Sequence, residues 1–174
     1  VASKYPAVGK VVPYIRADVG AFCTQHDHVP EWGPRALDLL EEGKRPEAVL
    51  LTLLENDANS ELRQLAVIDI RGRAAVHNPT AAPERSRYWA AITGRYYCCQ
   101  GNTLTGREVV VAMAKAYEET QGTLADRLMA ALVAGDAAGG DHRGRLALYV
   151  DKSDDAVRDL AKEYAQRQHD AKGP

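Results

Sequence analysis

Apolar residues along this chain follow two different spacings, which alternate in blocks. Short runs rich in β-branched residues predict strands at 8–15, 19–25, 63–70, 73–77, 96–100 and 147–150. Pro13 interrupts the first run, which predicts an edge strand or a bulge there. Only Arg71-Gly72 lies between the runs at 63–70 and 73–77, and so short a connection predicts a hairpin turn.

Prolines and capping residues mark where helices are predicted to begin. Gly33-Pro34 and Pro46 each place proline in a first helical turn, where the missing N–H is tolerated. The first of these helices is predicted to end at Gly43 and the second near Asn56-Asp57, and their short connection predicts an αα-hairpin. Ser153 predicts the start of the last helix.

Two further helices carry the pattern of a capping box, in which two side chains satisfy backbone N–H groups of the first turn. Thr105 is spaced for this with Glu108, and Thr123 with Asp126. The predicted buried stripes are Val109, Met113 and Tyr117 in the first helix, and Leu124, Leu128 and Leu132 in the second.

Strand runs alternate with pairs of helices rather than with single helices. This order favours an α+β fold, in which antiparallel sheets are covered by helix pairs, over a doubly wound parallel sheet. The 174 residues contain no repeat and no linker, so we expect residues 1–174 to form a single domain.

Composition narrows the classes of function. The net charge of -2 shows no long run of one sign, which argues against nucleic acid or an anionic membrane as the main partner. No apolar run approaches the length of a membrane span, and no signal peptide is visible. The three cysteines, Cys23, Cys98 and Cys99, do not form a disulfide framework, and we expect reduced thiols in a cytoplasmic protein.

Three glycine turns present polar groups, at 1–9, 97–102 and 139–145. Gly101-Asn102 follows a predicted strand and precedes a predicted helix. The asparagine amide, or the backbone N–H after Gly101, suits an oxyanion hole for a developing negative charge. A turn asparagine in a left-handed conformation is an equally good interpretation of these residues alone.

The turn at 139–145 is basic as well as glycine-rich. Asp141, Arg143 and Arg145 are candidate substrate-binding residues, because such a loop can hold a carboxylate or phosphate. The alternative is a structural turn in which the arginines pair with Asp136 or Asp141. The loop lacks the lysine and spacing of a P-loop, so nucleotide binding is not predicted.

A predicted strand ends at Thr24 and Gln25 and enters a loop at His26, which makes these three residues candidates for substrate binding. His26-Asp27-His28 lacks a third ligand position for zinc, so we expect neither a metal nor another cofactor. An exposed loop histidine is favoured, and His26 as a general base is the alternative. Arg63 is interpreted as a buried structural arginine rather than a substrate clamp.

Several segments in order resemble the domain-of-unknown-function family 1028: VASKYPAVGKVVPYIRADVGAFCTQ, WGPRALDLLEEG, ELRQLAVIDIRGRAAVH, QGNTLTGREVVVAM and AAGGDHRGR. The resemblance covers residues 1–145 and extends weakly to the last helix. It implies the N-terminal nucleophile (Ntn) hydrolase fold, a four-layer αββα sandwich of two antiparallel sheets packed face to face. It also implies amide hydrolysis.

In an Ntn hydrolase, the first residue supplies both the nucleophile and its base, and Val1 cannot do so. Members of the family usually begin with an extra strand before the position of Val1. They usually continue after the position of Arg145 with a further strand and a glycine-rich loop, and the hypothesis is that this sequence omits both segments. Ser3 is the nearest hydroxyl. A local hydrogen bond is its favoured role, and the resemblance makes Ser3 and Lys4 candidate pocket residues.

Three functions remain open at this point. The first is an Ntn-type amidohydrolase that acts on the C–N bond of a small amide, imide or peptide-like molecule. The second is a noncatalytic binding or assembly protein with the same fold. The third is a cysteine hydrolase that uses Cys23 or Cys98. A small-molecule substrate and a homo-oligomer are expected, the latter because the sheets leave edges to cover.

Overall fold

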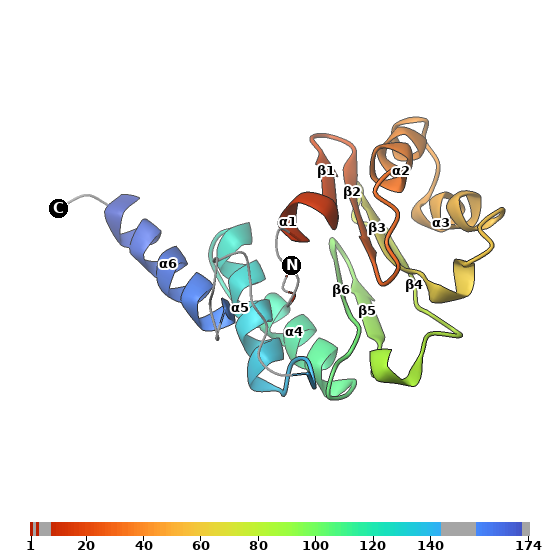
Figure 1. Cartoon of the computed structure of the whole chain (residues 1–174). Coiled ribbons are helices and arrows are strands. Elements are labelled where there is room, and N and C mark those ends of the chain that lie inside the picture. Colours follow the sequence, from red (N-terminus) through yellow and green to blue (C-terminus); the bar gives the residue numbers. More distant parts are fainter. Residues whose placement is uncertain (2, 4–7, 144–155, 172–174) are drawn as a thin grey trace.

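The computed structural model describes residues 1, 3, 8–143 and 156–171 (Figure 1). Its larger sheet is antiparallel, with the strand order β1-β2-β3-β4. The strands are β1 (Pro13–Arg16), β2 (Gly20–Gln25), β3 (Gln64–Asp69) and β4 (Ala74–His77). The predicted hairpin turn at Arg71-Gly72 joins the last two, with the register Ala66↔Val76.

The prediction of a strand from residue 8 is wrong, because the chain first forms the short helix α1 (Val8–Val11). Val8 and Val12 lie four residues apart and are both buried, which is helical spacing. The N–H of Val12 donates to the carbonyl of Val8 at 2.9 Å, so Val12 closes this turn. Pro13 has no N–H to donate, and β1 begins there as an edge strand.

The predicted αα-hairpin covers one face of this sheet. It consists of α2 (Trp32–Glu41) and α3 (Pro46–Leu54), followed by the short 3-10 turn η1 (Ser60–Leu62). Phe22, Leu65 and Val67 pack against the two helices. Because side chains alternate along a strand, the neighbouring Cys23 and Gln64 point to the opposite face of the sheet.

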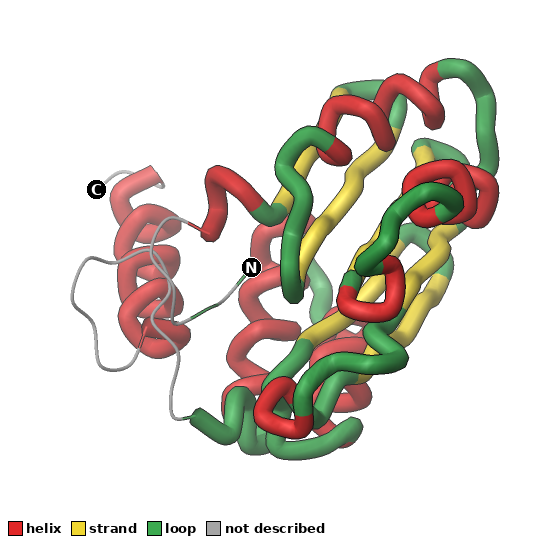
Figure 2. The backbone as a smooth tube through the Cα atoms, turned by 45° about the vertical axis from the view of Figure 1, so that its right-hand side comes forward, coloured by secondary structure: helices red, strands yellow, loops and turns green. Residues whose placement is uncertain are grey.

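The smaller sheet pairs β5 (Ala90–Gly94) with β6 (Tyr97–Gly101). It lies between the larger sheet and α4 (Glu108–Glu119), on which α5 (Leu124–Ala137) packs (Figures 1 and 2). Its core includes Ala90, Cys99 and Val110. The sequence did not predict β5, which follows a polar loop and the 3-10 turn η2 (Glu84–Ser86).

Only one of the two predicted capping boxes forms. The Thr123 hydroxyl accepts from the N–H of Asp126 at 3.2 Å, and the Asp126 carboxylate accepts from the N–H of Thr123 at 2.7 Å. Thr105 does not cap α4, which begins at Glu108 with no side-chain cap. The N–H of Thr105 instead donates to the carbonyl of Gly140 at 2.9 Å, so a contact between distant segments overrides the local pattern.

The stripe predicted to be buried in α5 is also wrong, since Leu124 is 61% exposed and Leu128 is 51% exposed. The buried residues are Ala131 and Gly135. A Cβ atom on Gly135 would lie 2.7 Å from the Cγ of Met113 in α4. At Gly135 the two helices therefore approach too closely for a larger side chain.

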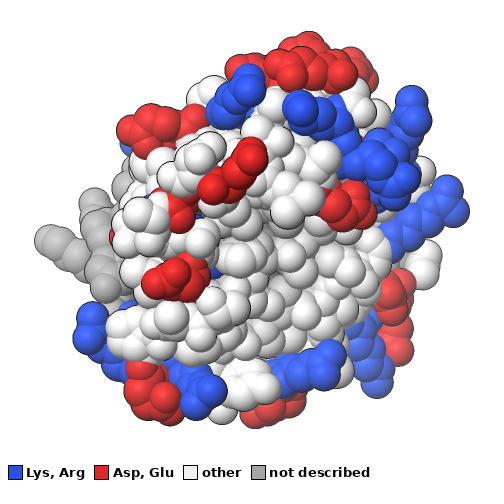
Figure 3. All heavy atoms as spheres, turned by 90° about the vertical axis from the view of Figure 1, so that its right-hand side faces the viewer, with Lys and Arg blue, Asp and Glu red and all other residues white. Residues whose placement is uncertain are grey.

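The last helix, α6 (Ala156–Ala171), packs on α5, where the Tyr164 hydroxyl donates to Asp126 at 2.8 Å. The predicted strand at 147–150 and the predicted cap Ser153 lie outside the described residues. None of the helices in the described part of the chain has the length and apolar character to cross a bilayer. On the face carrying α2 and α3, acidic and basic side chains intersperse around an uncharged centre (Figure 3).

Two adjacent valines in α4 test this packing, because Val110 is 0% exposed and Val111 is 47% exposed. Val110→Ala is expected to lower the free energy of unfolding by about 2 kcal/mol, from lost burial and the cavity left behind. Val111→Ala should leave it nearly unchanged. Thermal denaturation of both variants measures the difference, and equal losses would contradict the assigned orientation of α4.

Candidate functional site

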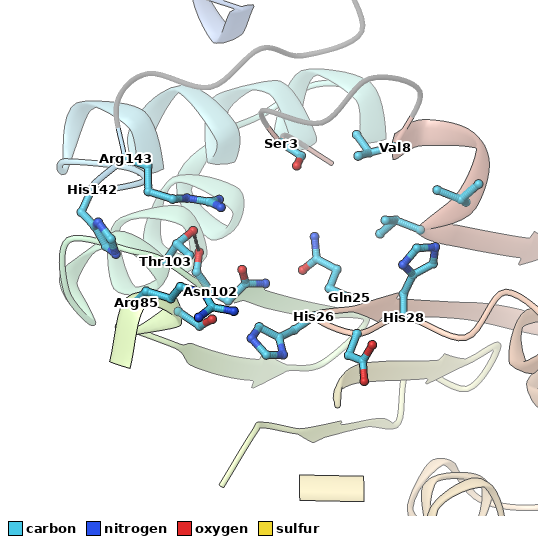
Figure 4. A pocket seen from close by; sticks show the side chains of 14 residues that line it. Ser3, Val8, Gln25, His26, His28, Arg85, Asn102, Thr103, His142 and Arg143 are labelled. Atoms are coloured by element: carbon cyan, nitrogen blue, oxygen red, sulfur yellow. Dashed lines mark hydrogen bonds between the residues drawn. The ribbon is translucent and has the colours of Figure 1, made fainter. Parts of the chain in front are cut away.

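A cavity of about 880 Å³ opens beside the end of β2 (Figure 4). Gln25, His26 and His28 lie on one side of it, and side chains from η2, from the turn after β6 and from the segment after α5 lie on the other. The lining residues are Ser3, Val8, Val11, Val12, Gln25, His26, Asp27, His28, Arg85, Ser86, Asn102, Thr103, His142 and Arg143.

The loop that leaves β2 turns sharply at the cavity wall. His26 and Asp27 both have left-handed backbones, with φ of 48° and 52°, which is uncommon outside glycine. The Nδ1 of His26 lies 2.6 Å from the carbonyl oxygen of Leu62. Because a carbonyl only accepts, Nδ1 is the donor in this hydrogen bond, and Nε2 is the other ring nitrogen of His26.

Arg63 holds this loop in place from behind. Its guanidinium binds Asp57 through Nε at 2.7 Å and Nη2 at 2.9 Å, and its Nη1 binds the backbone oxygen of Asp27. The hydrogen bonds from Arg63 lower the pKa of Asp57. Trp32 packs under the guanidinium with its ring 5.3 Å away. The structural interpretation of Arg63 made from the sequence is therefore confirmed.

The Gln64 side chain joins the two sheets at the floor of the site. It is 0% exposed, and its Nε2 donates to the carbonyl of Gly101 at 2.8 Å and to the Oδ1 of Asn78 at 2.9 Å. Its Oε1 accepts from the Nδ2 of Asn102 at 3.0 Å. An asparagine amide nitrogen carries two N–H groups, so Asn102 keeps one further donor at the cavity wall.

The segment after Asn102 runs between two others like a central strand. The N–H of Thr103 donates to the carbonyl of Ser86 at 2.8 Å, and its carbonyl accepts from the N–H of His142 at 2.9 Å. Leu104 exchanges backbone hydrogen bonds with Tyr88 on one side and bridges to Asp141 on the other. These bonds fix the side of the cavity that carries η2 and the residues after α5.

Asp141 is 6% exposed, and its carboxylate accepts hydrogen bonds from Thr103 and Arg143 within this wall. Burial alone would raise the pKa of Asp141, but hydrogen bonds from Arg143 and Thr103 outweigh it, and the pKa lies below its ordinary value. Arg143 reaches the carboxylate through Nε at 2.9 Å and also through Nη2. The pairing of Arg143 with Asp141, which was the structural alternative for this turn, is present, and Arg143 also borders the cavity.

The structure brings five of the ten predicted site residues to one cavity. Ser3, Gln25, His26, Asn102 and Arg143 line the cavity. The carbonyl of Gly101 accepts a hydrogen bond from Gln64. A Cβ atom on Gly101 would lie 2.8 Å from the Leu104 side chain. Lys4 and Arg145 lie outside the described residues.

Thr24 is the predicted site residue that the structure places elsewhere. It is 0% exposed and does not line the cavity. It alternates with Gln25 along β2, and its hydroxyl accepts from the N–H of Val29 at 3.2 Å. The sequence missed Arg85, Ser86 and His142, and the polar loop around Pro83 gave no signal for the first two.

The third function considered, a cysteine hydrolase, is not supported. Neither Cys23 nor Cys98 lines the cavity. Burial raises the pKa of Cys98 to about 12 and also raises that of Cys23, which disfavours the thiolate that would attack a substrate. Among the described residues, no three His, Cys, Asp or Glu side chains are grouped to hold a metal ion.

Comparison with known proteins supplies the family. The model of the family of unknown function DUF1028 matches residues 1–170. The chain belongs to this family. Its fold is similar to the crystal structure of a DUF1028 protein from Silicibacter pomeroyi, with a TM-score of 0.82 and 25% identity over 95% of this chain and 80% of that chain. No curated protein gives a significant match.

Two glutamines with buried side-chain amides, Gln64 in β3 and Gln100 in β6, test the role of the Gln64 bridge. Gln64→Leu leaves Gly101, Asn78 and Asn102 without partners and is expected to cost about 3 kcal/mol of unfolding free energy. Gln100→Leu is the matched control, because neither polar side-chain atom of Gln100 has a hydrogen-bond partner. It should be neutral or slightly stabilising in chemical denaturation. Equal destabilisation by both variants would contradict the bridge.

The lowered pKa of Asp141 predicts a pH-dependent contribution to stability. It is fully present above the unfolded-state pKa of about 3.9 and is lost as pH falls through the lower folded-state pKa. Asp141→Asn should therefore cost about 2 kcal/mol at neutral pH and progressively less in acid. Melting curves between neutral and acidic pH test this, with Asp18→Asn at an exposed turn as control. A loss that stays constant into acid would refute the assignment.

Proposed function

We propose that this protein is an Ntn-type hydrolase that cleaves the C–N bond of a small amide, imide or peptide-like molecule in this cavity. The observation that carries the proposal is the Asn102 amide, held by Gln64 with one N–H bonded and the other left for a ligand. A fixed donor at a cavity wall is what stabilises the oxyanion formed when an amide carbonyl is attacked.

The arrangement of the layers supports the same proposal. The αββα sandwich of an Ntn hydrolase requires helices, sheet, sheet and helices in succession. Here α2 and α3, the larger sheet, the smaller sheet, and α4 with α5 follow one another in that order (Figure 1). The cavity volume of about 880 Å³ also lies in the range of small-molecule sites.

The proposed reaction assigns a role to each part of the wall. The nucleophile is the first residue of the mature protein, with its α-amine as the base, and it adds to the amide carbonyl. Asn102 donates to the oxygen that becomes negative. The amine then leaves with a proton, and water hydrolyses the resulting ester or thioester. His26, whose Nδ1 is held by the Leu62 carbonyl, and Ser3 contact the substrate.

Asn102→Ala tests this assignment in the mature protein. Loss of one oxyanion donor is expected to lower kcat about 100-fold with a smaller change in KM. Release of ammonia or amine from primary amides, N-acyl amino acids and cyclic imides is the measurement. Asn56→Ala, at an exposed position, is the control and should keep full activity.

The alternative is the noncatalytic binding or assembly protein. It predicts no release from any of these substrates and a mature amino terminus that is blocked or lacks Thr, Ser or Cys. Amino-terminal sequencing of the mature protein, together with the release assay, decides between the two functions.

A further inference from the structure

Among the charged side chains that line the cavity, Arg85 differs from Asp27 and Arg143 because it has no ion-pair partner in the described part of the chain. Asp27 lies 3.1 Å from Arg63, and the Asp141 carboxylate binds Arg143. Arg85 borders the same cavity but makes no ion pair or hydrogen bond with any residue in the described part of the chain. Arg63 is shared between Asp27 and Asp57, and the Arg85 guanidinium is left without a direct partner among these residues.

The nearest acidic neighbour in sequence does not neutralise Arg85. Glu84 lies 3.3 Å from the guanidinium of Arg87, on the other side of Ser86. Arg87 also stacks on Trp89, with 5.5 Å from its guanidinium to the ring centroid. Two arginines in one short turn thus differ in surroundings, because Arg87 is paired and stacked whereas Arg85 lies at the cavity wall (Figure 4).

The backbone that carries Arg85 is fixed even though its side chain is exposed. Ser86, the next residue, is 8% exposed, and its carbonyl accepts from the N–H of Thr103 at 2.8 Å. That bond ties η2 to the residue that follows Asn102. The cation and the spare amide donor are therefore set on adjoining backbone segments at one side of the cavity (Figure 4).

We propose that Arg85 is the specificity residue of this cavity, and that the ligand carries a carboxylate that binds Arg85 while its amide group reaches Asn102. A guanidinium offers a planar pair of N–H donors that matches the two oxygens of a carboxylate. This inference rests on the proposed function for the amide half of the ligand. The expected substrate class is a small amide that bears one carboxylate.

Two probes of equal size separate the charge from the amide. Succinamate has one carboxylate and one primary amide, and succinamide has two amides and no charge. Their dissociation constants with the mature protein can be measured by ligand-observed NMR. Succinamate is expected to bind at least about tenfold more tightly, the size of a charge-assisted hydrogen bond, and added salt should reduce the difference.

Arg85→Gln should abolish the preference for succinamate, and the matched Arg87→Gln should keep it. The proposal is overturned if neither probe binds, if the two bind equally, if Arg85→Gln keeps the preference, or if Arg87→Gln loses it as well. Ammonia release, measured in the same samples, separates the two proposals. Preferential binding of succinamate without ammonia release would contradict the hydrolase alone. Equal ammonia release from both probes, unchanged in Arg85→Gln, would contradict the carboxylate site alone.

Discussion

The hydrogen bonds of one buried amide, that of Gln64, determine how the candidate site is built. A fully buried amide is costly unless its donors and acceptor are all paired, and Gln64 pairs all of them. The carbonyl of Gly101 only accepts, so the amide nitrogen of Gln64 must face β6 and its oxygen must face Asn102. The orientation of the Asn102 amide thus follows from a backbone carbonyl.

The rest of the cavity wall is held by contacts of the same kind. Arg63 fixes the left-handed turn at His26 and Asp27 from behind, through Asp57 and Trp32. Backbone ladders hold the segment after Asn102 between η2 and the residues after α5. A site whose polar groups are oriented before the ligand arrives loses less entropy on binding.

Much of the architecture could be predicted from the sequence, because it depends on local signals. The αα-hairpin follows from Pro46 and the leucine spacing, and Asn102 was found because a glycine turn after a strand is a local pattern. Gln64 gave no signal, since its partner Gly101 lies 37 residues away. The predicted capping box at Thr105 failed for the same reason. The N–H of Thr105 donates to the carbonyl of Gly140, which is distant in sequence, and Thr105 does not cap the first turn of α4.

The stripe predicted in α5 failed for a different physical reason. Helical spacing identifies an apolar face, but it does not reveal over how much of its length that face is covered. The buried residues of α5, Ala131 and Gly135, lie in its second half, where Gly135 faces Met113, whereas Leu124 and Leu128 in its first half are exposed. Arg85 was missed because an arginine in a polar loop is ordinary, and only the pairing of the surrounding charges singles it out.

The side-chain amide NMR spectrum of the protein tests the central claim most directly. The account predicts that both amide protons of Gln64 exchange slowly with solvent, and that the two protons of Asn102 differ. One should be protected by Gln64, and the other should shift when succinamate is added. The exposed Asn56 supplies the reference for a free amide. If both Asn102 protons exchange as fast as those of Asn56 and neither responds to succinamate, the oriented donor does not exist.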